Sequence, residues 1–148
     1  MLLAVFGGYF GIVHGSLRMP LAEGGSQLGR RIADARQQGG PVFVDFTANW
    51  CWNCKTYEKL VLHTEVVQQA FKDKNVVTII ADWTLPDEEI EAWLREYGRI
   101  GVPFYLLYRP GEKEPLTFDG LTRDSLLNEL SKSGEPASDR SKTVAQGK

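Results

Sequence analysis

Hydrophobic and polar positions along the chain predict a regular succession of helices and strands. Residues 27–38 carry apolar side chains at helical spacing, and Gly39-Gly40 ends that pattern. Residues 41–47 and 76–81 are nearly continuous apolar runs, which is the pattern of strands buried on both faces. Residues 104–108 form a third apolar run of strand length, so we expect at least three strands.

Further helices and one short strand complete the pattern. A helix is expected from the segment after residue 50 to about Leu62, with a continuation capped by Thr64. Thr84-Leu85-Pro86-Asp87 resembles a helix start, and Gly98 is a suitable stop for that helix. A fourth strand is expected near residues 115–118 and a last helix over 123–131, capped by Thr122.

The order of these elements predicts an α/β fold with a mixed central β-sheet and helices on both faces. The first three strands are joined through helices, so we expect them to pair in parallel. A short turn at residues 109–112 joins the last two strands, which should be antiparallel.

The chain divides into a leader with a linker (1–25), a domain (26–133) and a tail expected to be disordered (134–148). Met1 to Val13 is uncharged and apolar, but about 13 residues are fewer than the roughly 20 that cross a bilayer. Three interpretations stay open: the end of a membrane helix that starts outside this chain, a weak signal or anchor, or a packed or disordered leader. Membrane association through residues 1–13 is therefore possible.

Composition narrows the function without naming it. A chain of 148 residues with 43% hydrophobic residues can build one domain with a real core. A formal net charge of −2 and the absence of a basic cluster give no support for nucleic-acid binding.

The only two cysteines carry the clearest chemical signal. Cys51 and Cys54 directly follow the apolar run 41–47 and open the next helix. A thiol at a helix N-terminus is favoured as the thiolate, which is the nucleophile of thiol–disulfide exchange. We expect Cys51 to be exposed and to attack a partner disulfide, and the more buried Cys54 to release the partner.

Other uses of the cysteine pair are weaker. Zinc needs about four ligands, and beyond the thiols the chain offers only His14 and His63, without a suitable spacing. A purely structural disulfide rarely closes so short a ring. We therefore expect no metal, and no cofactor other than the redox-active disulfide.

Two acidic residues are candidates for proton transfer. Asp45 interrupts the apolar run six residues before Cys51, and burial of a carboxylate is costly without a reason. A buried acid there would have a raised pKa and could move protons for Cys54. Glu58 lies one turn after Cys54 on the same helix face, whereas Lys55 is expected to point elsewhere. The alternatives are an edge-strand Asp and a solvated helix Glu.

Residues around the cysteines suggest a docking surface. Trp50 and Trp52 flank Cys51, whereas Trp93 is more simply a core residue and Trp83 could be either. Val102-Pro103 stands before the third strand, where an X-Pro bond can be cis, although few X-Pro bonds are.

The stretch from Val44 to Lys55, which contains Asp45, Trp50 and both cysteines, resembles the active-site segment of the thioredoxin family. Gly101-Val102-Pro103 resembles that family's cis-proline loop. The resemblance implies a thioredoxin fold and a cis Pro103 facing the disulfide. It further implies that the Val102 backbone binds a docked partner and that Asp45 is the buried proton-transfer acid.

A narrower resemblance is to the C-terminal periplasmic domain of the DsbD family of thiol:disulfide interchange proteins. It rests on residues 47–51, Glu58, residues 81–84 and residues 98–103. The resemblance implies a protein-disulfide reductase that takes electrons from a membrane electron-carrier domain and passes them to a periplasmic redox domain. It also implies a periplasmic location, tethered to the bacterial inner membrane.

One departure limits these implications. Trp52-Asn53 replaces the Gly-Pro that thioredoxin has between its cysteines, so the motif does not fix the direction of electron flow. The rival hypotheses are a free-standing thioredoxin-like reductase and a thioredoxin-fold binding module with a static disulfide.

Overall fold

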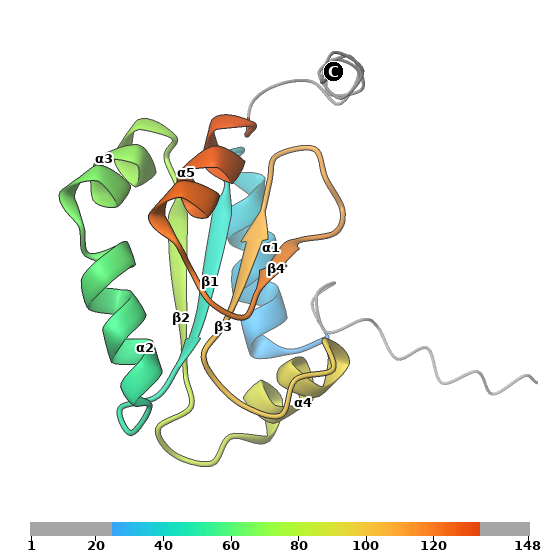
Figure 1. The fold of residues 1–148 in the computed structure, drawn as a ribbon. Helices are drawn as coiled ribbons and strands as arrows, with labels where there is room; N and C mark the ends of the chain where they lie inside the picture. The colour runs from blue at the N-terminus through green and yellow to red at the C-terminus, as the bar shows by residue number, and fades with distance from the viewer. Residues whose placement is uncertain (1–24, 134–148) are drawn as a thin grey trace, which may run out of the picture.

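A four-stranded sheet with the order β2-β1-β3-β4 forms the centre of the protein in the computed structural model, which describes residues 25–133 (Figure 1). The strands are β1 (Val42–Thr47), β2 (Val77–Asp82), β3 (Phe104–Tyr108) and β4 (Leu116–Phe118). The helices are α1 (Gln27–Gln37), α2 (Trp52–Tyr57), the π-helical turn η2 (Glu58–Leu62), α3 (Glu65–Asp73), α4 (Glu88–Glu96) and α5 (Arg123–Ser131). This mixed sheet between helices confirms the predicted fold class.

The expected leader and tail lie outside the described residues. None of the helices between residues 25 and 133 combines the length and the apolar character needed to cross a membrane.

Strand directions match the prediction except at β3. β1 and β2 are parallel and β3 and β4 antiparallel, but β3 runs antiparallel to β1, its neighbour in the sheet. The expectation that the third strand is parallel to the first two is therefore wrong. The nine residues of α4 span only about 13 Å. They lie at the sheet end where β2 finishes, so β3 starts from that same end (Figure 1).

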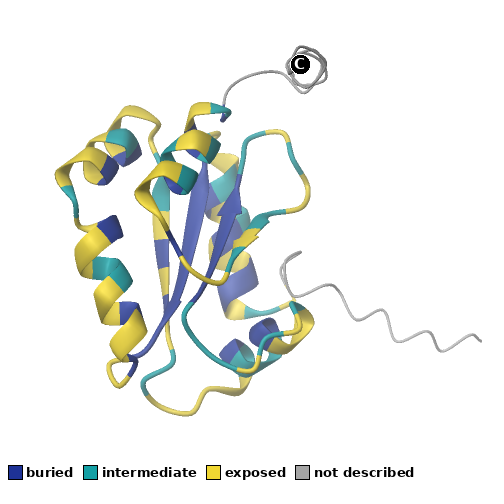
Figure 2. Cartoon of the chain, in the orientation of Figure 1, coloured by how far each residue is buried: buried dark blue, intermediate teal, exposed yellow. Residues whose placement is uncertain are grey.

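Two hydrophobic cores, one on each face, hold the sheet between its helices. α1 and α4 cover the face that carries Val44 and Phe46. η2, α3 and α5 cover the face that carries Phe43 and Tyr105. All residues of β1 and β3 are buried, as Figure 2 shows for the two central strands. The strand that leads to Cys51 is thus closed to water on both sides.

β2 differs from the fully buried strand that its apolar sequence predicts. It is an edge strand in the described sheet, and its residues alternate between buried and exposed. Ile79 faces the core at 4% exposure, whereas Ile80 is 48% exposed.

Capping residues set most of the helix boundaries. Ser26 accepts a hydrogen bond from the Gly29 N–H, and Thr122 forms a capping box with Ser125. Gly98 follows α4 with a φ of 69°, a conformation that glycine adopts at little cost. These caps confirm the predicted ends of three helices.

One predicted cap, Thr84, is wrong, and another, Thr64, is right in position but not in its hydrogen bond. α4 begins at Glu88 because the Asp87 carboxylate accepts hydrogen bonds from the N–H groups of Glu89 and Ile90, at 2.9 and 3.0 Å. Thr84 is therefore free for a different role. Thr64 precedes α3 as expected, but its hydroxyl donates to the Val61 carbonyl and caps no backbone N–H.

The two adjacent isoleucines of β2 test its one-sided burial. We expect Ile79→Ala to lower the free energy of unfolding by about 3 kcal/mol, because it leaves a cavity in the core. Ile80→Ala should cost less than about 1 kcal/mol, because this side chain is half exposed. Guanidinium denaturation of the two variants measures the difference; equal losses would mean that β2 is covered on both faces.

Candidate active site at the Cys51–Cys54 disulfide

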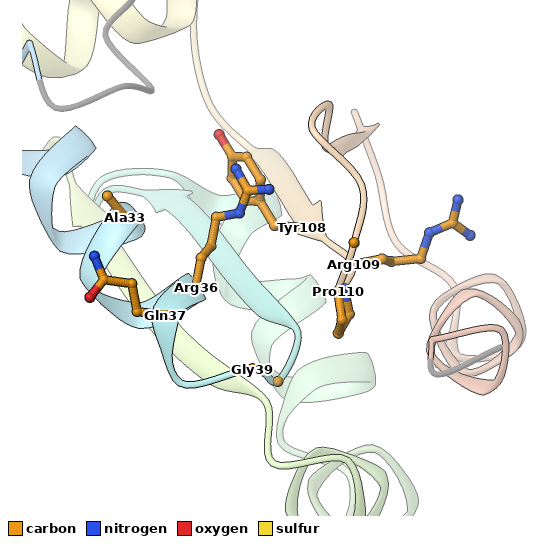
Figure 3. A pocket seen from close by; sticks show the side chains of 9 residues that line it. Ala33, Arg36, Gln37, Gly39, Tyr108, Arg109 and Pro110 are labelled. Atoms are coloured by element: carbon orange, nitrogen blue, oxygen red, sulfur yellow. The ribbon is translucent and has the colours of Figure 1, made fainter. Parts of the chain in front are cut away.

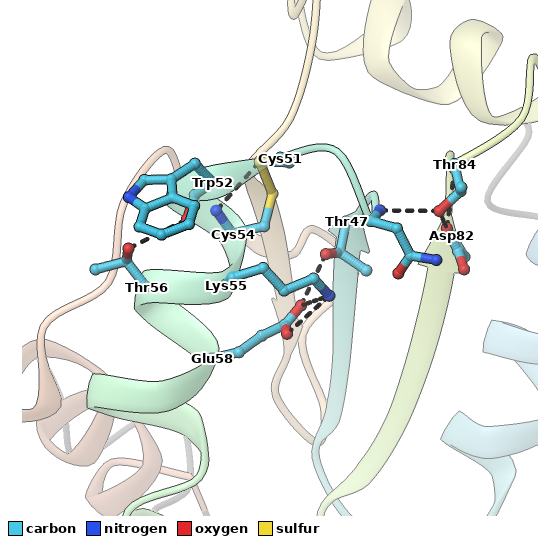
Figure 4. Close-up of a disulfide and its surroundings, with 10 residues drawn as sticks. Thr47, Cys51, Trp52, Cys54, Lys55, Thr56, Glu58, Asp82 and Thr84 are labelled. Atoms are coloured by element: carbon cyan, nitrogen blue, oxygen red, sulfur yellow. Dashed lines mark hydrogen bonds and ion pairs between the residues drawn. A yellow bond between two sulfur atoms is a disulfide. The ribbon is translucent and has the colours of Figure 1, made fainter.

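Cys51 and Cys54 form a disulfide at the end of β1, where the chain turns into α2 (Figure 4). Cys51 is the N-cap residue of α2, and its Sγ accepts a hydrogen bond of 3.1 Å from the Cys54 N–H. Cys54 is fully buried, as expected. Cys51 is 6% exposed, so the expectation of an exposed first cysteine is wrong for this oxidised state.

The loop before β3 covers Cys51 and explains its low exposure. Val102 packs against a small cluster made of Ala48 and the two cysteines. The Val102–Pro103 peptide bond is cis, as the family resemblance implies. The loop before β3 and the turn before α2 therefore meet at the disulfide, although 50 residues of sequence separate them.

Asp45 is 3% exposed in the middle of β1, which confirms its predicted burial. Its Oδ1 atom has no hydrogen-bond partner among the described residues. Tyr105 of β3 is its partner in the sheet register. The pKa of Asp45 is raised to about 7, chiefly by burial and also by repulsion from Glu58, while Lys55 acts in the opposite direction. Asp45 can therefore gain or lose a proton near neutral pH.

Glu58 lies at the start of η2, and its side chain is partly exposed at the edge of the buried region that contains Asp45. Its Oε1 accepts a hydrogen bond of 2.8 Å from the Thr47 hydroxyl. Lys55 forms an ion pair with the same carboxylate at 3.0 Å. Figure 4 shows Lys55 and Glu58 both reaching from the helix toward Thr47 on β1. The prediction that Lys55 points elsewhere is therefore wrong, because the helix places it within reach of the residue three positions later.

The turn before Cys51 is attached to the end of β2 through Thr84. The Thr84 hydroxyl accepts a hydrogen bond of 2.9 Å from the Asn49 N–H and donates to Asp82. The Thr84 carbonyl accepts from the Trp50 indole N–H at 3.2 Å. Sequence reasoning missed this clasp. The available signal is Thr84 two residues after Asp82 at a strand end, whereas the spacing of Thr84 and Asp87 favours a helix start.

Large apolar side chains surround the disulfide on the surface. Trp50 and Trp52 are 60% and 82% exposed. Trp50 packs edge-to-face on Trp83, with 5.8 Å between ring centroids. Trp83 and the fully exposed Ile100 line one shallow cavity of about 370 Å³. Trp93 is buried in the core, as predicted, whereas Trp83 contributes to both core and surface.

A second cavity, of about 450 Å³, lies at the opposite end of the sheet (Figure 3). The Arg36 guanidinium stacks on the Tyr108 ring at 4.9 Å. Arg109 forms ion pairs with Glu112 and Glu129, and Figure 3 shows its side chain directed away from the cavity. Side chains of this same chain therefore already contact both arginines, and no cysteine lines the cavity. The redox chemistry of the described residues is therefore confined to the disulfide end.

A disulfide that closes between two residues one turn apart can be opened by a thiolate of another protein, and the reduced pair can in turn attack another disulfide. On this fold, with the residue before a cis-proline packed against the cysteines, such a pair defines the class of thioredoxin-like thiol–disulfide oxidoreductases. The chain belongs to the thioredoxin-like family, whose profile matches residues 25–110.

Similar proteins lie mainly in one branch of that class. The chain is 34% identical over 89 residues to thiol:disulfide interchange protein DsbD 1 of Pseudomonas aeruginosa, covering 60% of this chain and 15% of the relative. It is 37% identical over 86 residues to DsbD of Yersinia enterocolitica, covering 57% of this chain and 14% of the relative. The chain thus corresponds to a small part of these relatives.

Solved structures agree with this placement. The C-terminal domain of Neisseria meningitidis DsbD in the oxidised form superposes with a TM-score of 0.55 at 28% identity, covering 72% of this chain and 92% of that domain. A thioredoxin from Thermus thermophilus superposes with a TM-score of 0.53 at 25% identity, covering 71% and 85%. The fold expectation and the family resemblance are both confirmed.

The buried Asp45 predicts a pH-dependent gain in stability on substitution. In an unfolded chain an Asp titrates near 3.9, whereas in the folded protein the pKa of Asp45 is about 7. The folded state therefore binds more protons between these values, and the free energy of unfolding falls as pH rises through that range. We expect Asp45→Asn to stabilise the oxidised protein by about 4 kcal/mol at pH 8 and very little at pH 4.

Guanidinium denaturation at the two pH values measures this difference. Asp34→Asn, at an exposed position of α1, is the control and should give a small change at both. An Asp45→Asn effect of equal size at pH 4 and pH 8 would contradict the raised pKa.

Proposed function

We propose that this protein transfers electron pairs between protein thiols and disulfides through Cys51 and Cys54. We further propose that it does so as a DsbD-like periplasmic reductant at the inner membrane, taking electrons from a membrane electron carrier and passing them to a periplasmic redox domain. The similarity to DsbD sequences and to a DsbD C-terminal domain supports this direction. The observation that carries the proposal is the Cys51–Cys54 disulfide, closed at a helix start within an exposed apolar surface.

The first step begins with the reduced pair. The Cys51 thiolate attacks one sulfur of the partner's disulfide, forming a mixed disulfide and releasing the partner's other sulfur as a thiolate. The backbone N–H of Cys54, which already donates to Cys51 Sγ, would stabilise the attacking thiolate. The helix dipole acts in the same direction.

The second step needs a proton acceptor inside the protein. Cys54 is fully buried, so its thiol needs a nearby base before it can attack. The Asp45 carboxylate accepts that proton, and the Cys54 thiolate then attacks Cys51 Sγ. This forms the Cys51–Cys54 bond, breaks the mixed disulfide and releases the partner's second thiolate, which takes a proton from water. The partner gains two electrons and the Cys51–Cys54 pair loses two.

A partner polypeptide would dock on the surface beside the sulfurs. Trp50 and Trp52 offer aromatic faces on one side of the disulfide. Val102 packs against the cysteines, and its backbone, next to the cis Pro103, would bind an extended partner segment. Apolar surface of this kind buries water-exposed area on docking, which gives the short-lived complex its stability.

Cysteine substitutions test the roles of the two thiols. We expect Cys54→Ser to accumulate mixed disulfides with a disulfide-bonded protein substrate, because Cys51 can attack but nothing releases the partner. Cys51→Ser should lose exchange altogether. Non-reducing gel electrophoresis and mass spectrometry detect the adducts, and dithiothreitol should release them.

The double variant, in which both cysteines are replaced by Ser, is the matched control and should form no adduct. If Cys54→Ser trapped nothing while Cys51→Ser kept its activity, the assigned roles would be reversed.

The reduction potential separates exchange from a static disulfide. An exchanging pair should equilibrate with glutathione or dithiothreitol buffers and give a potential between about −180 and −270 mV, the range of protein disulfide isomerase and thioredoxin. A binding module with a structural disulfide should lie below about −300 mV. A value in that lower range, together with no turnover of a disulfide substrate, would reject the proposed function.

A further inference from the structure

We propose that Thr47 and Lys55 are positioning residues that hold the Glu58 carboxylate between solvent and the buried Asp45, and thereby set the pH at which Asp45 exchanges its proton. This inference rests on the proposed exchange function, in which Asp45 takes the proton of Cys54. It assigns a role to two residues that carry no redox chemistry of their own.

Contacts on both oxygens of Glu58 carry the inference. Oε1 accepts from the Thr47 hydroxyl at 2.8 Å. Lys55 Nζ lies 3.0 Å from Oε2 and 3.3 Å from Oε1. The carboxylate is thus held from the sheet side by a neutral donor and from the solvent side by a cation. A glutamate on a helix surface would otherwise sample several rotamers.

Burial changes steadily along this series of side chains. Asp45 is 3% and Thr47 6% exposed, whereas the side chains of Glu58 and Lys55 are 16% and 45% exposed. Asp45 and Thr47 are two positions apart on β1, so their side chains point to the same face of the sheet. Glu58, bonded to Thr47, therefore stands on Asp45's side of the sheet, at the border between the interior and water.

The charges around Asp45 define what this arrangement does. Glu58 disfavours ionisation of Asp45, and Lys55 favours it less strongly. The other titratable groups that face this region are phenols, Tyr57 on α2 and Tyr105 on β3. Burial raises the pKa of Tyr105 further above its ordinary value, so this group stays neutral at physiological pH. The Glu58–Lys55 pair is thus the adjustable charge next to Asp45.

Loss of the Thr47 hydroxyl and loss of the Lys55 cation should shift the pKa of Asp45 in opposite directions. Without the Thr47 hydroxyl, Glu58 can turn toward water together with Lys55, and Asp45 then ionises more readily. Without the Lys55 cation, Glu58 stays on Thr47 with its charge uncompensated, and Asp45 ionises less readily. A purely structural role for the two residues would not give shifts of opposite sign.

The experiment follows the Asp45 carboxyl carbon by ¹³C NMR across pH in the oxidised protein, where the cysteines do not titrate. The resonance is assigned by its loss in Asp45→Asn. We expect Thr47→Val to lower the midpoint by about half a pH unit or more, and Lys55→Met to raise it by a similar amount. The pH profile of disulfide exchange by the same variants should move in the same directions.

Conservative and matched variants make the result specific. Thr47→Ser keeps the hydroxyl and Lys55→Arg keeps the charge, so both should retain a midpoint near the wild-type value. Thr56→Val and Lys59→Met repeat the two substitutions at exposed positions of the same helical segment and should shift nothing. In a Glu58→Gln background, Thr47→Val should have no further effect, because its action passes through Glu58.

Two outcomes would overturn the inference: unchanged midpoints in both variants, or shifts of the same sign. Either would leave the proposed function standing, provided that Cys54→Ser traps its partner. Opposite shifts in a protein whose Cys54→Ser variant traps nothing would support the positioning role while rejecting thiol–disulfide exchange.

Discussion

The burial of one carboxyl group, that of Asp45, is the constraint on which the rest of this structure depends. Every other side chain of β1 except Thr47 is apolar, and the whole strand is closed to water. A carboxylate in such a strand is unfavourable by several kcal/mol unless it is protonated or paired. Burial keeps Asp45 largely protonated below about pH 7, and the same raised pKa makes its ionised form the stronger base that the proposed exchange step needs. The raised pKa of Asp45 thus lowers the stability of the fold at high pH, while it favours the proposed redox function.

The elements around Asp45 fix the positions of Cys51 and Glu58 relative to it. β1 continues from Asp45 through Thr47 to the turn that Thr84 holds against the end of β2, so the strand delivers Cys51 to a fixed position. The following helix returns Glu58 to Thr47, which keeps one further charge at the border of the buried region. The change from α2 to the π-helical turn η2 falls at Glu58 itself, and such turns are frequent at functional sites.

Local sequence patterns predicted the features that depend on neighbouring residues. The helix at residues 27–37 and the buried strand around Asp45 follow from periodicity and burial rules, and the position of the cysteine pair at a helix start follows from the order of these elements. The cis bond before Pro103 came from family resemblance alone. What failed depends on contacts between distant segments: the direction of β3, the open face at Ile80 and the clasp at Thr84. A strand's apolar composition does not show whether a helix covers it, because that depends on where the helix packs.

Unpartnered buried polar atoms occur both near the disulfide end of the sheet and at the opposite end. Among the described residues, four buried side-chain polar atoms have no hydrogen-bond partner, in Asp45, Trp83, Tyr105 and Tyr108. Asp45 and Tyr105 pair across the sheet behind the disulfide, and Trp83 packs on Trp50 at the surface beside it. Tyr108 lines the cavity at the opposite end of the sheet, so these atoms alone do not distinguish the two ends. Unsatisfied groups cost stability, and Asp45 is the one among the four that the proposed exchange reaction supplies with a partner, the proton of Cys54. The exposed Trp50 and Trp52 would likewise gain a partner, a docked polypeptide, only during that reaction.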